Sequence, residues 1–265
     1  MALLMFVISL TFDFSEVKIA LQKWKLLLLA LGLVFGPMAI ISLALGRLFF
    51  TDFDLILGQV LVGVLPTDVS TPLLVYLAKG STALAAMMNT INTALTPLIL
   101  PFLLLLLTGI EFEIPASILI LELFLIIVIP MLAGVSLRTK FTEKVIEYEP
   151  LYSFISSNLY LLLLFTVVTD SATFIMDYKL YALGILGVQL LLNLIGYGLA
   201  LLFKPVINER KDHIALLFTA STKEFSIAVA VAYTAGLAEI VVIPAVCYAI
   251  VQMLTSPDVD FASGN

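Results

Sequence analysis

Two short stretches place ionisable side chains inside long apolar segments. The first, LPTDVSTPLLVYLAKG at residues 65–80, contains Asp68 and several hydroxyl residues. The second, FTASTKEFSIAVAVAYTAG at residues 218–236, contains Lys223 and Glu224. Carboxylates, hydroxyls and backbone groups released from helical bonding can bind small ions and polar substrates. Both stretches are therefore candidate binding sites.

Proline and capping signals predict that both stretches interrupt a helix. Pro72 removes a backbone donor and disfavours helix at Thr71, so one half-helix is expected to end near Leu65 and another to begin at about Thr71. In the second stretch, Ser221 or Thr222 is expected to cap a new half-helix. A helix can break inside a bilayer only where protein or a water-filled cavity satisfies the freed backbone groups.

Interrupted helices at corresponding places in two halves of a chain predict the binding site of a secondary transporter. Free N–H groups and a positive dipole at the start of a half-helix suit an anion, whereas freed carbonyls and hydroxyls suit a small cation. We therefore expect transport of a small organic anion by alternating access. The predicted substrate-binding residues are Asp68, Val69, Ser70, Thr71, Glu224, Phe225 and Ser226.

The elements that must position these residues are membrane-spanning helices. The 265-residue chain is 62% hydrophobic and 12% charged, with a mean hydropathy of +1.17. A soluble domain carries about twice that charged fraction, so we expect a single membrane domain in the lipid bilayer. A spanning helix needs about 20 apolar residues. Eight long segments are expected, at residues 24–46, 54–79, 82–109, 115–137, 151–175, 179–203, 212–235 and 237–255.

The loop charges predict how the chain is oriented. Lysine and arginine concentrate in alternate loops, for example around Lys79 and Arg138, whereas loop 110–114 carries two acids and no base. By the positive-inside rule, the basic loops and the C-terminus are expected in the cytoplasm of a cell-membrane protein. Residues 1–12 are too short to span the bilayer, so they are interpreted as the end of a helix whose start is missing.

The motifs resemble a known family. Residues 65–101, LPTDVSTPLLVYLAKGSTALAAMMNTINTALTPLILP, resemble the first crossing region of the bile acid:sodium symporter family. FTASTKEFSIAVAVA resembles its second crossing and is also similar to that of the related arsenite exporters. The resemblance implies ten helices in two inverted five-helix repeats, of which this chain would lack the first helix and half of the second. A core (24–109 and 179–255) would move against a panel (1–12 and 115–175).

The resemblance also implies two sodium sites, whose ligand positions mostly carry other residue types here. Those positions correspond to Gly32, Thr71, Pro72, Ala85, Asn89, Thr219 and Lys223. Hydroxyl and amide ligands persist at Thr71, Asn89 and Thr219, whereas Lys223 stands where the family has a glutamine. The predicted ion-binding or coupling residues are Thr71, Asn89, Thr219, Lys223, Asp68 and Glu224.

Lys223 is expected to replace a bound cation, with Asp68 or Glu224 as its counter-ion, because an unpaired charge in mid-membrane is costly. A permanent ion pair that only holds the crossing together is one alternative, and a lysine that carries a proton during the cycle is another. Sodium, the only cofactor considered, is therefore one candidate coupling ion. The alternative is a proton-coupled or sodium-independent exporter or uniporter.

Other functional classes fit less well. Ser221, Lys223 and Glu224 offer a nucleophile and a base for an intramembrane enzyme, but no partner motif accompanies them. A channel would need a continuous polar stripe along several helices. One histidine and one cysteine exclude a zinc site of His/Cys type, and no basic cluster indicates a nucleic-acid partner. His213 itself is expected in a loop.

Overall fold

The computed structural model of the chain describes residues 2–10, 22–109, 116–170 and 179–256, which form helices and turns with no strand among them. The predicted all-α class is confirmed. The elements are α1 (Ala2–Ser9), α3 (Trp24–Phe35), α4 (Pro37–Phe49), α5 (Phe53–Val64), α6 (Thr71–Leu77), α7 (Thr82–Thr108), α8 (Ala116–Leu123), the π-helical turn η1 (Phe124–Val128), α9 (Ile129–Lys140), α10 (Thr142–Glu147), α11 (Glu149–Asp170), α13 (Lys179–Leu202), the 3-10 turn η2 (Lys204–Val206), α14 (Arg210–Ser221), α15 (Phe225–Thr234), the 3-10 turn η3 (Glu239–Val242) and α16 (Ile243–Thr255).

Among the described residues, five helical stretches are long and apolar enough to cross a membrane: Trp24–Phe49, Thr82–Thr108, Ser117–Lys140, Ala182–Val206 and Arg210–Thr234. Two shorter apolar stretches are Phe53–Val64, which follows the first of these, and Glu239–Thr255, which follows the last. The protein is therefore a polytopic all-α membrane protein. The inverted repeat and the missing first helix stay predictions, and loop 110–114 lies outside the described residues.

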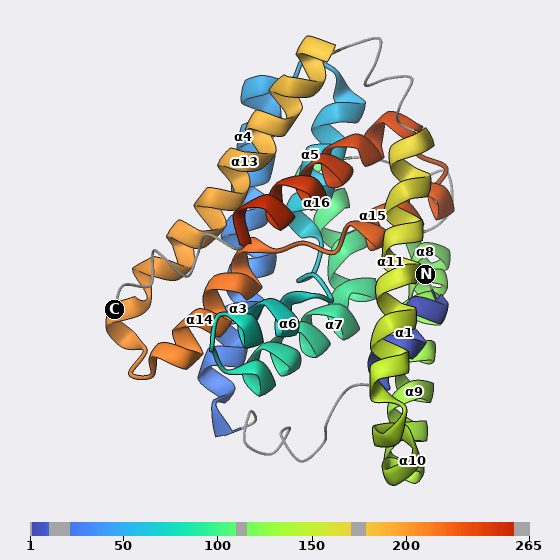
Figure 1. The fold of residues 1–265 in the computed structure, drawn as a ribbon. Helices are drawn as coiled ribbons and strands as arrows, with labels where there is room; N and C mark the ends of the chain where they lie inside the picture. The colour runs from blue at the N-terminus through green and yellow to red at the C-terminus, as the bar shows by residue number, and fades with distance from the viewer. Residues whose placement is uncertain (1, 11–21, 110–115, 171–178, 257–265) are drawn as a thin grey trace.

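The helices form two groups of unequal size (Figure 1). Helices α1, α9 and α11 stand together along one side, with α1 packed against both α9 and α11, and α10 lies at the end of this group. Helices α3 to α7 and α13 to α16 form the larger group. Helix α8 packs on α7 and α15 of this group, and α11 of the smaller group contacts α15 and α16. The predicted division into core and panel, and the movement of one against the other, stay predictions.

The span Trp24–Phe49 is bent rather than straight. Helix α3 ends at Phe35 and α4 begins at Pro37, with Gly36 between them. Proline lacks the N–H that would bond a carbonyl one turn earlier, so it ends the helical ladder of α3 at this point. Backbone carbonyls in the last turn of α3 are thereby free to accept hydrogen bonds from elsewhere.

Helix α5 packs so closely on its neighbours that two glycines are required. A Cβ at Gly63 would lie 2.3 Å from the Cβ of Ser42 on α4, and one at Gly58 would lie 2.3 Å from the carbonyl oxygen of Val241. The Ser42 hydroxyl also donates to the backbone carbonyl of Gln59 within α5. These contacts fix the position of α5, and with it the break that follows Val64.

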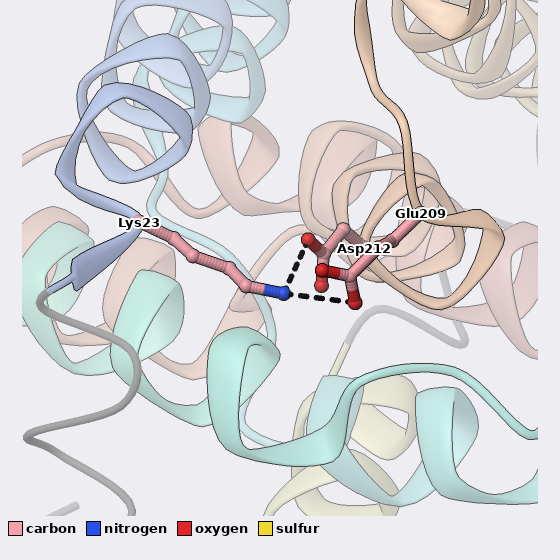
Figure 2. A network of polar contacts seen from close by, with 3 residues as sticks. All are labelled: Lys23, Glu209 and Asp212. Carbon is pink, nitrogen blue, oxygen red and sulfur yellow. Dashed lines mark hydrogen bonds and ion pairs between the residues drawn. The ribbon is translucent and has the colours of Figure 1, made fainter.

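An ion pair joins the chain before α3 to the start of α14 (Figure 2). Lys23 Nζ lies 2.6 Å from Asp212 Oδ2 and 3.1 Å from Glu209 Oε2. Partial burial lowers the pKa of Lys23, but the hydrogen bonds and charges of the two carboxylates outweigh it and raise this pKa above its ordinary value. The pair ties two helices of the larger group together at one end.

The single histidine does not lie in a loop, so that prediction is wrong. His213 belongs to the first turn of α14 and is 6% exposed, with Nε2 3.1 Å from the carbonyl oxygen of Ala200 on α13. The charged run before it suggested a loop. Helix first turns accept such polar residues, because their N–H groups need partners outside the helix.

Candidate functional site

Both predicted helix breaks are confirmed. Helix α5 ends at Val64 and α6 begins at Thr71, as the proline and capping signals indicated. Helix α14 ends at Ser221 and α15 begins at Phe225. The connecting segments 65–70 and 222–224 are extended or turn-like, so their backbone groups must find partners outside a helical ladder.

The two connecting segments cross and bond to each other. Several hydrogen bonds carry this contact. Among them, the Glu224 N–H donates to the Pro66 carbonyl at 3.0 Å, the Thr67 hydroxyl donates to the Thr219 carbonyl at 3.1 Å, and the Thr71 and Thr222 hydroxyls lie 2.6 Å apart. Residues about 150 positions apart in sequence are thus held together without a shared helix.

The residue that caps α15 differs from the prediction. Glu224 is the N-cap, and its Oε1 accepts from the Ser226 N–H at 3.2 Å and from the Ser226 hydroxyl. Ser221 and Thr222, the predicted caps, belong to the end of α14, and the Ser221 hydroxyl donates to the Leu217 carbonyl at 2.8 Å. That bond turns the Ser221 hydroxyl back into its own helix.

The start of α6 is also held by a carboxylate. Ser70, one residue earlier than predicted, is the N-cap, and its side chain makes no capping bond. Instead Asp68 Oδ1 accepts from the Ser70 N–H at 2.7 Å and from the Ser70 hydroxyl, while Glu224 Oε2 accepts from the Val69 N–H at 3.0 Å. The N–H groups that were expected to face an anion are thus bonded to carboxylates of the chain itself.

Lys223 is enclosed by backbone carbonyls. Its Nζ donates to the carbonyl oxygens of Val34 at 3.1 Å, Gly63 at 3.0 Å and Leu65 at 2.9 Å, and the residue is 1% exposed. Val34 lies in the last turn of α3, while Gly63 and Leu65 lie at the end of α5. We call these three oxygens the carbonyl cage. Two helix ends whose carbonyls lose their helical donors at the breaks thus share one ammonium.

The predicted ion pair of Lys223 with Asp68 or Glu224 is not formed. The Lys223 ammonium donates instead to three backbone carbonyls, those of Val34, Gly63 and Leu65. The physical reason is that each group has closer partners of another kind. The Lys223 ammonium bonds to carbonyls freed at the helix ends. The carboxylates of Asp68 and Glu224 accept hydrogen bonds from N–H groups freed at the starts of the half-helices.

A glutamine that the sequence did not single out connects the two breaks. Gln252 on α16 donates from Nε2 to Asp68 Oδ2 at 3.0 Å, and its Oε1 accepts from the Lys223 N–H at 2.8 Å. It is fully buried. Nearby, Asn92 on α7 donates to the Thr67 hydroxyl at 3.0 Å. An amide in the middle of an apolar helix was the available signal for both residues.

The three predicted hydroxyl and amide ligands do not bond to one another among the described residues. Asn89 Oδ1 accepts from the Thr93 hydroxyl at 3.2 Å, and the Thr219 hydroxyl donates to Met88 Sδ at 3.4 Å. Thr71 instead meets Thr222. Of the predicted substrate residues, Val69 and Ser70 are partly exposed, and five are buried: Asp68, Thr71, Glu224, Phe225 and Ser226.

Comparison with known proteins identifies relatives of the chain. Residues 1–178 match the sodium bile acid symporter family. The chain is also 25% identical over 147 residues to the uncharacterized sodium-dependent transporter YocS of Bacillus subtilis (strain 168). That similarity spans 55% of this chain and 45% of YocS, so the chain matches less than half of this relative's length. The family match covers the first crossing segment and both helices that flank it, α5 and α6.

Proposed function

The chain belongs to the sodium bile acid symporter family, and from this premise we propose that it is a secondary active transporter working by alternating access. The observation that carries the proposal is the crossing of two broken helices, at 65–70 and 222–224, inside an apolar bundle. Broken helices of this kind form the midplane binding sites of such transporters. The grouping of α1 with α9 and α11 supports a panel against which the larger group moves.

Lys223 takes the place of one bound cation in this proposal. Its ammonium lies among three carbonyl oxygens at 2.9 to 3.1 Å, the type of ligand that a sodium ion takes from broken helices. The positive charge is therefore part of the chain. Thr71, Asn89 and Thr219 remain candidates for a separate sodium site, and the name of YocS, a sodium-dependent transporter, supports testing for one.

The proposed cargo is a small organic anion, recognised at the starts of α6 and α15. The N–H groups of Val69, Ser70 and Ser226 are its candidate donors, and in this state they bond to Asp68 and Glu224. The anion must compete with those carboxylates. We also propose that the basic loops and the C-terminus lie in the cytoplasm, which the loop charges favour.

The role of Lys223 can be tested without knowing the cargo. The melting temperature of the purified protein is measured in sodium, potassium and choline salts at equal ionic strength. Lys223→Gln, which restores the residue type of the family, is expected to gain a sodium-specific rise beyond that of the unmodified protein, because an ion bound only by the folded state stabilises it. Lys204→Gln, at an exposed lysine on η2, is the matched control. An equal response in all three proteins would remove Lys223 as a substitute for sodium.

Alternating access itself can be tested by cysteine labelling, because Cys247 is the single cysteine and is buried. In a Cys247→Ala background, Ser70→Cys places a thiol at the partly exposed start of α6. A membrane-impermeant maleimide is expected to label it from either face of the membrane, in proportions that change with the ion gradient. Labelling from one face under every condition would contradict the proposal.

A further inference from the structure

Helix α13 carries a polar face inside the apolar bundle. Gln189, Asn193 and Tyr197 follow one another at intervals of four residues, so their side chains lie on one face of the helix. Gln189 and Asn193 are fully buried, and Tyr197 is 8% exposed. Helix α13 packs against α4, α14 and α16, and α16 lies between α13 and α11 (Figure 1). We call these three residues the polar face of α13.

The middle of the polar face holds the end of α14. Asn193 Nδ2 donates to the Ser221 carbonyl at 2.7 Å, and the Tyr248 hydroxyl of α16 donates to the same oxygen at 2.7 Å. The Thr255 hydroxyl donates to Asn193 Oδ1 at 2.8 Å. Ser221 is the last residue of α14, directly before the break that carries Lys223. The polar face therefore satisfies a carbonyl that this break frees, and both ends of the Asn193 amide have partners.

Each end of the same face holds a polar atom without a partner. In the part of the chain that the structure describes, three buried side-chain atoms lack a hydrogen-bond partner, and two of them are Gln189 Oε1 and Tyr197 Oη. The Tyr197 ring lies edge-on to Phe218, with 6.2 Å between the ring centroids, and its hydroxyl interacts electrostatically with that of Tyr248 without bonding to it. Leaving a hydroxyl or an amide unbonded in an apolar interior is costly, so such groups normally bind something.

The position beside Gln189 needs a partner whichever way its amide is turned. Gln189 Nε2 donates to Gln59 Oε1 at 2.5 Å, and Gln59 Nε2 donates to the Ser42 hydroxyl at 3.2 Å. Turning the Gln189 amide alone would bring two oxygens together, and turning both amides would put an N–H group where Gln189 Oε1 lies. Each amide nitrogen carries two N–H groups, of which these bonds use one. A molecule that both donates and accepts hydrogen bonds therefore fits this position.

We propose that the polar face of α13 is a hydration site, with one water molecule bound at the Tyr197 hydroxyl and another at Gln189 Oε1. Buried water in proteins makes about three hydrogen bonds to groups that lack other partners. A sodium ion fits less well, because the N–H groups of Gln59 and Gln189 adjoin the free oxygen. The site goes beyond the proposed transport and does not depend on it. Because α16 lies between this face and α11, the water is expected to stay bound whether the substrate site is open or closed.

Radiolytic labelling detects such water in the unmodified protein. A short X-ray pulse converts bound water into hydroxyl radicals, which modify the nearest side chains even where these are buried, and mass spectrometry measures the rate. We expect several times faster modification of Tyr197 and of Met38, whose Cε would lie 3.3 Å from a Cβ on Gly196. Phe35, at 7% exposed, and the buried Met5 are the matched controls. Rates for Tyr197 and Met38 no higher than those of the controls would overturn the proposal.

Two further labelling measurements locate the water. Leu192→Met, a change that conserves volume, places a reactive thioether three residues from Gln189 on α13, and Leu61→Met is its fully buried control on α5. Equal rates in these two variants would reject the water at Gln189. Labelling of Tyr197 is also compared in sodium and choline salts at equal ionic strength. Equal rates in both salts are expected, whereas a rate that depends on sodium would assign the water to the opening of the transport site and overturn the proposal.

The stability of Tyr197→Phe tests the same water through the sign of its effect. If water binds the hydroxyl, the variant loses a buried hydrogen bond and its melting temperature is expected to fall by about 2–4 °C. If the hydroxyl had no partner, its removal would relieve a desolvation cost and raise the melting temperature. Tyr233→Phe, at a highly exposed tyrosine, is the control and should leave the melting temperature nearly unchanged. An unchanged or raised value in Tyr197→Phe would overturn the proposal.

Discussion

The two broken helices contribute different chemistry to their crossing. The break at 65–70 is the longer one, and its main contribution is backbone acceptors, the carbonyls of Leu65 and Pro66. The break at 222–224 is shorter and contributes an ammonium and a carboxylate. The first segment supplies one oxygen of the cage, that of Leu65, and the second supplies the ammonium that the cage encloses. The two segments therefore differ in chemistry, and complementary groups hold their crossing together.

The largest effect is expected from removing the charge and keeping the cage. Lys223→Leu leaves three buried carbonyls without their common donor, so the free energy of unfolding is expected to fall by about 3–5 kcal/mol. Denaturation in choline salt measures it, since sodium could refill the cage. Lys204→Leu at an exposed position should cost less than about 0.5 kcal/mol. A loss of similar size in both variants would mean that the cage does not depend on its ammonium.

The next effect concerns the residue that serves both breaks at once. Gln252→Met removes a donor to Asp68 and an acceptor for the Lys223 N–H, at an expected cost of about 1–3 kcal/mol. Met253→Leu, at the next position on α16 but partly exposed, is the control. Combining Gln252→Met with Asp68→Asn should cost less than the sum of the two single changes. Strict additivity would show that Gln252 does not link the two segments.

A smaller effect tests the direct contact between hydroxyls. Thr71→Val and Thr222→Val are each expected to cost about 0.5–1.5 kcal/mol, because each leaves the opposite hydroxyl facing a methyl group. The double variant should be more stable than the sum predicts, since no buried hydroxyl then lacks this partner. Thermal unfolding of the four proteins measures the coupling. If the two single changes were additive, the contact between the hydroxyls would not contribute to holding the two segments together.

The smallest loss of stability is expected from changing Lys23, which is half-buried near the surface, whereas Lys223 is buried at the crossing. Lys23 is paired with Asp212 and Glu209 near the surface, so Lys23→Gln is expected to cost about 1 kcal/mol or less and to cost less still at high salt. Its raised pKa means that the stabilisation is complete below the ordinary lysine value of 10.5 and is lost as pH rises through the higher folded value. Unfolding measured on both sides of that value checks the sign. A loss of this stabilisation that begins near neutral pH would contradict the raised pKa of Lys23.

The positions of the breaks were predictable because proline and polar residues leave a mark in an apolar sequence. Pro72 marks the start of α6 to within a residue, and the Ser–Thr–Lys–Glu run marks the end of α14. The partners of Lys223 were not predictable, because any residue type carries a carbonyl and Val34, Gly63 and Leu65 have no polar side chain. The predicted ion pair was wrong for the same reason. Side-chain charge was visible in the sequence, whereas the competing backbone groups were not.

The contact of Gln252 shows a second limit. The amide was visible within α16, but which face of that helix meets the crossing depends on how α13 and α5 pack against it. Asn89 and Thr219 illustrate the reverse case. Both are buried, and each bonds to a neighbour within the bundle rather than to the other predicted ligands. Sequence similarity located the region, and local packing decided which groups face one another.

The carbonyl cage has an electrical consequence for a carrier. Moving one elementary charge across a membrane potential is worth about 2.3 kcal/mol per 100 mV. A sodium ion that crosses once per cycle delivers that energy together with the energy of its own gradient. In the proposed alternating-access cycle, an ammonium tethered at Lys223 would move outward and inward with its cage, so it would contribute no net current. Under that proposal Lys223 would set the voltage sensitivity of each half-cycle, and the driving force for accumulation would have to come from another ion.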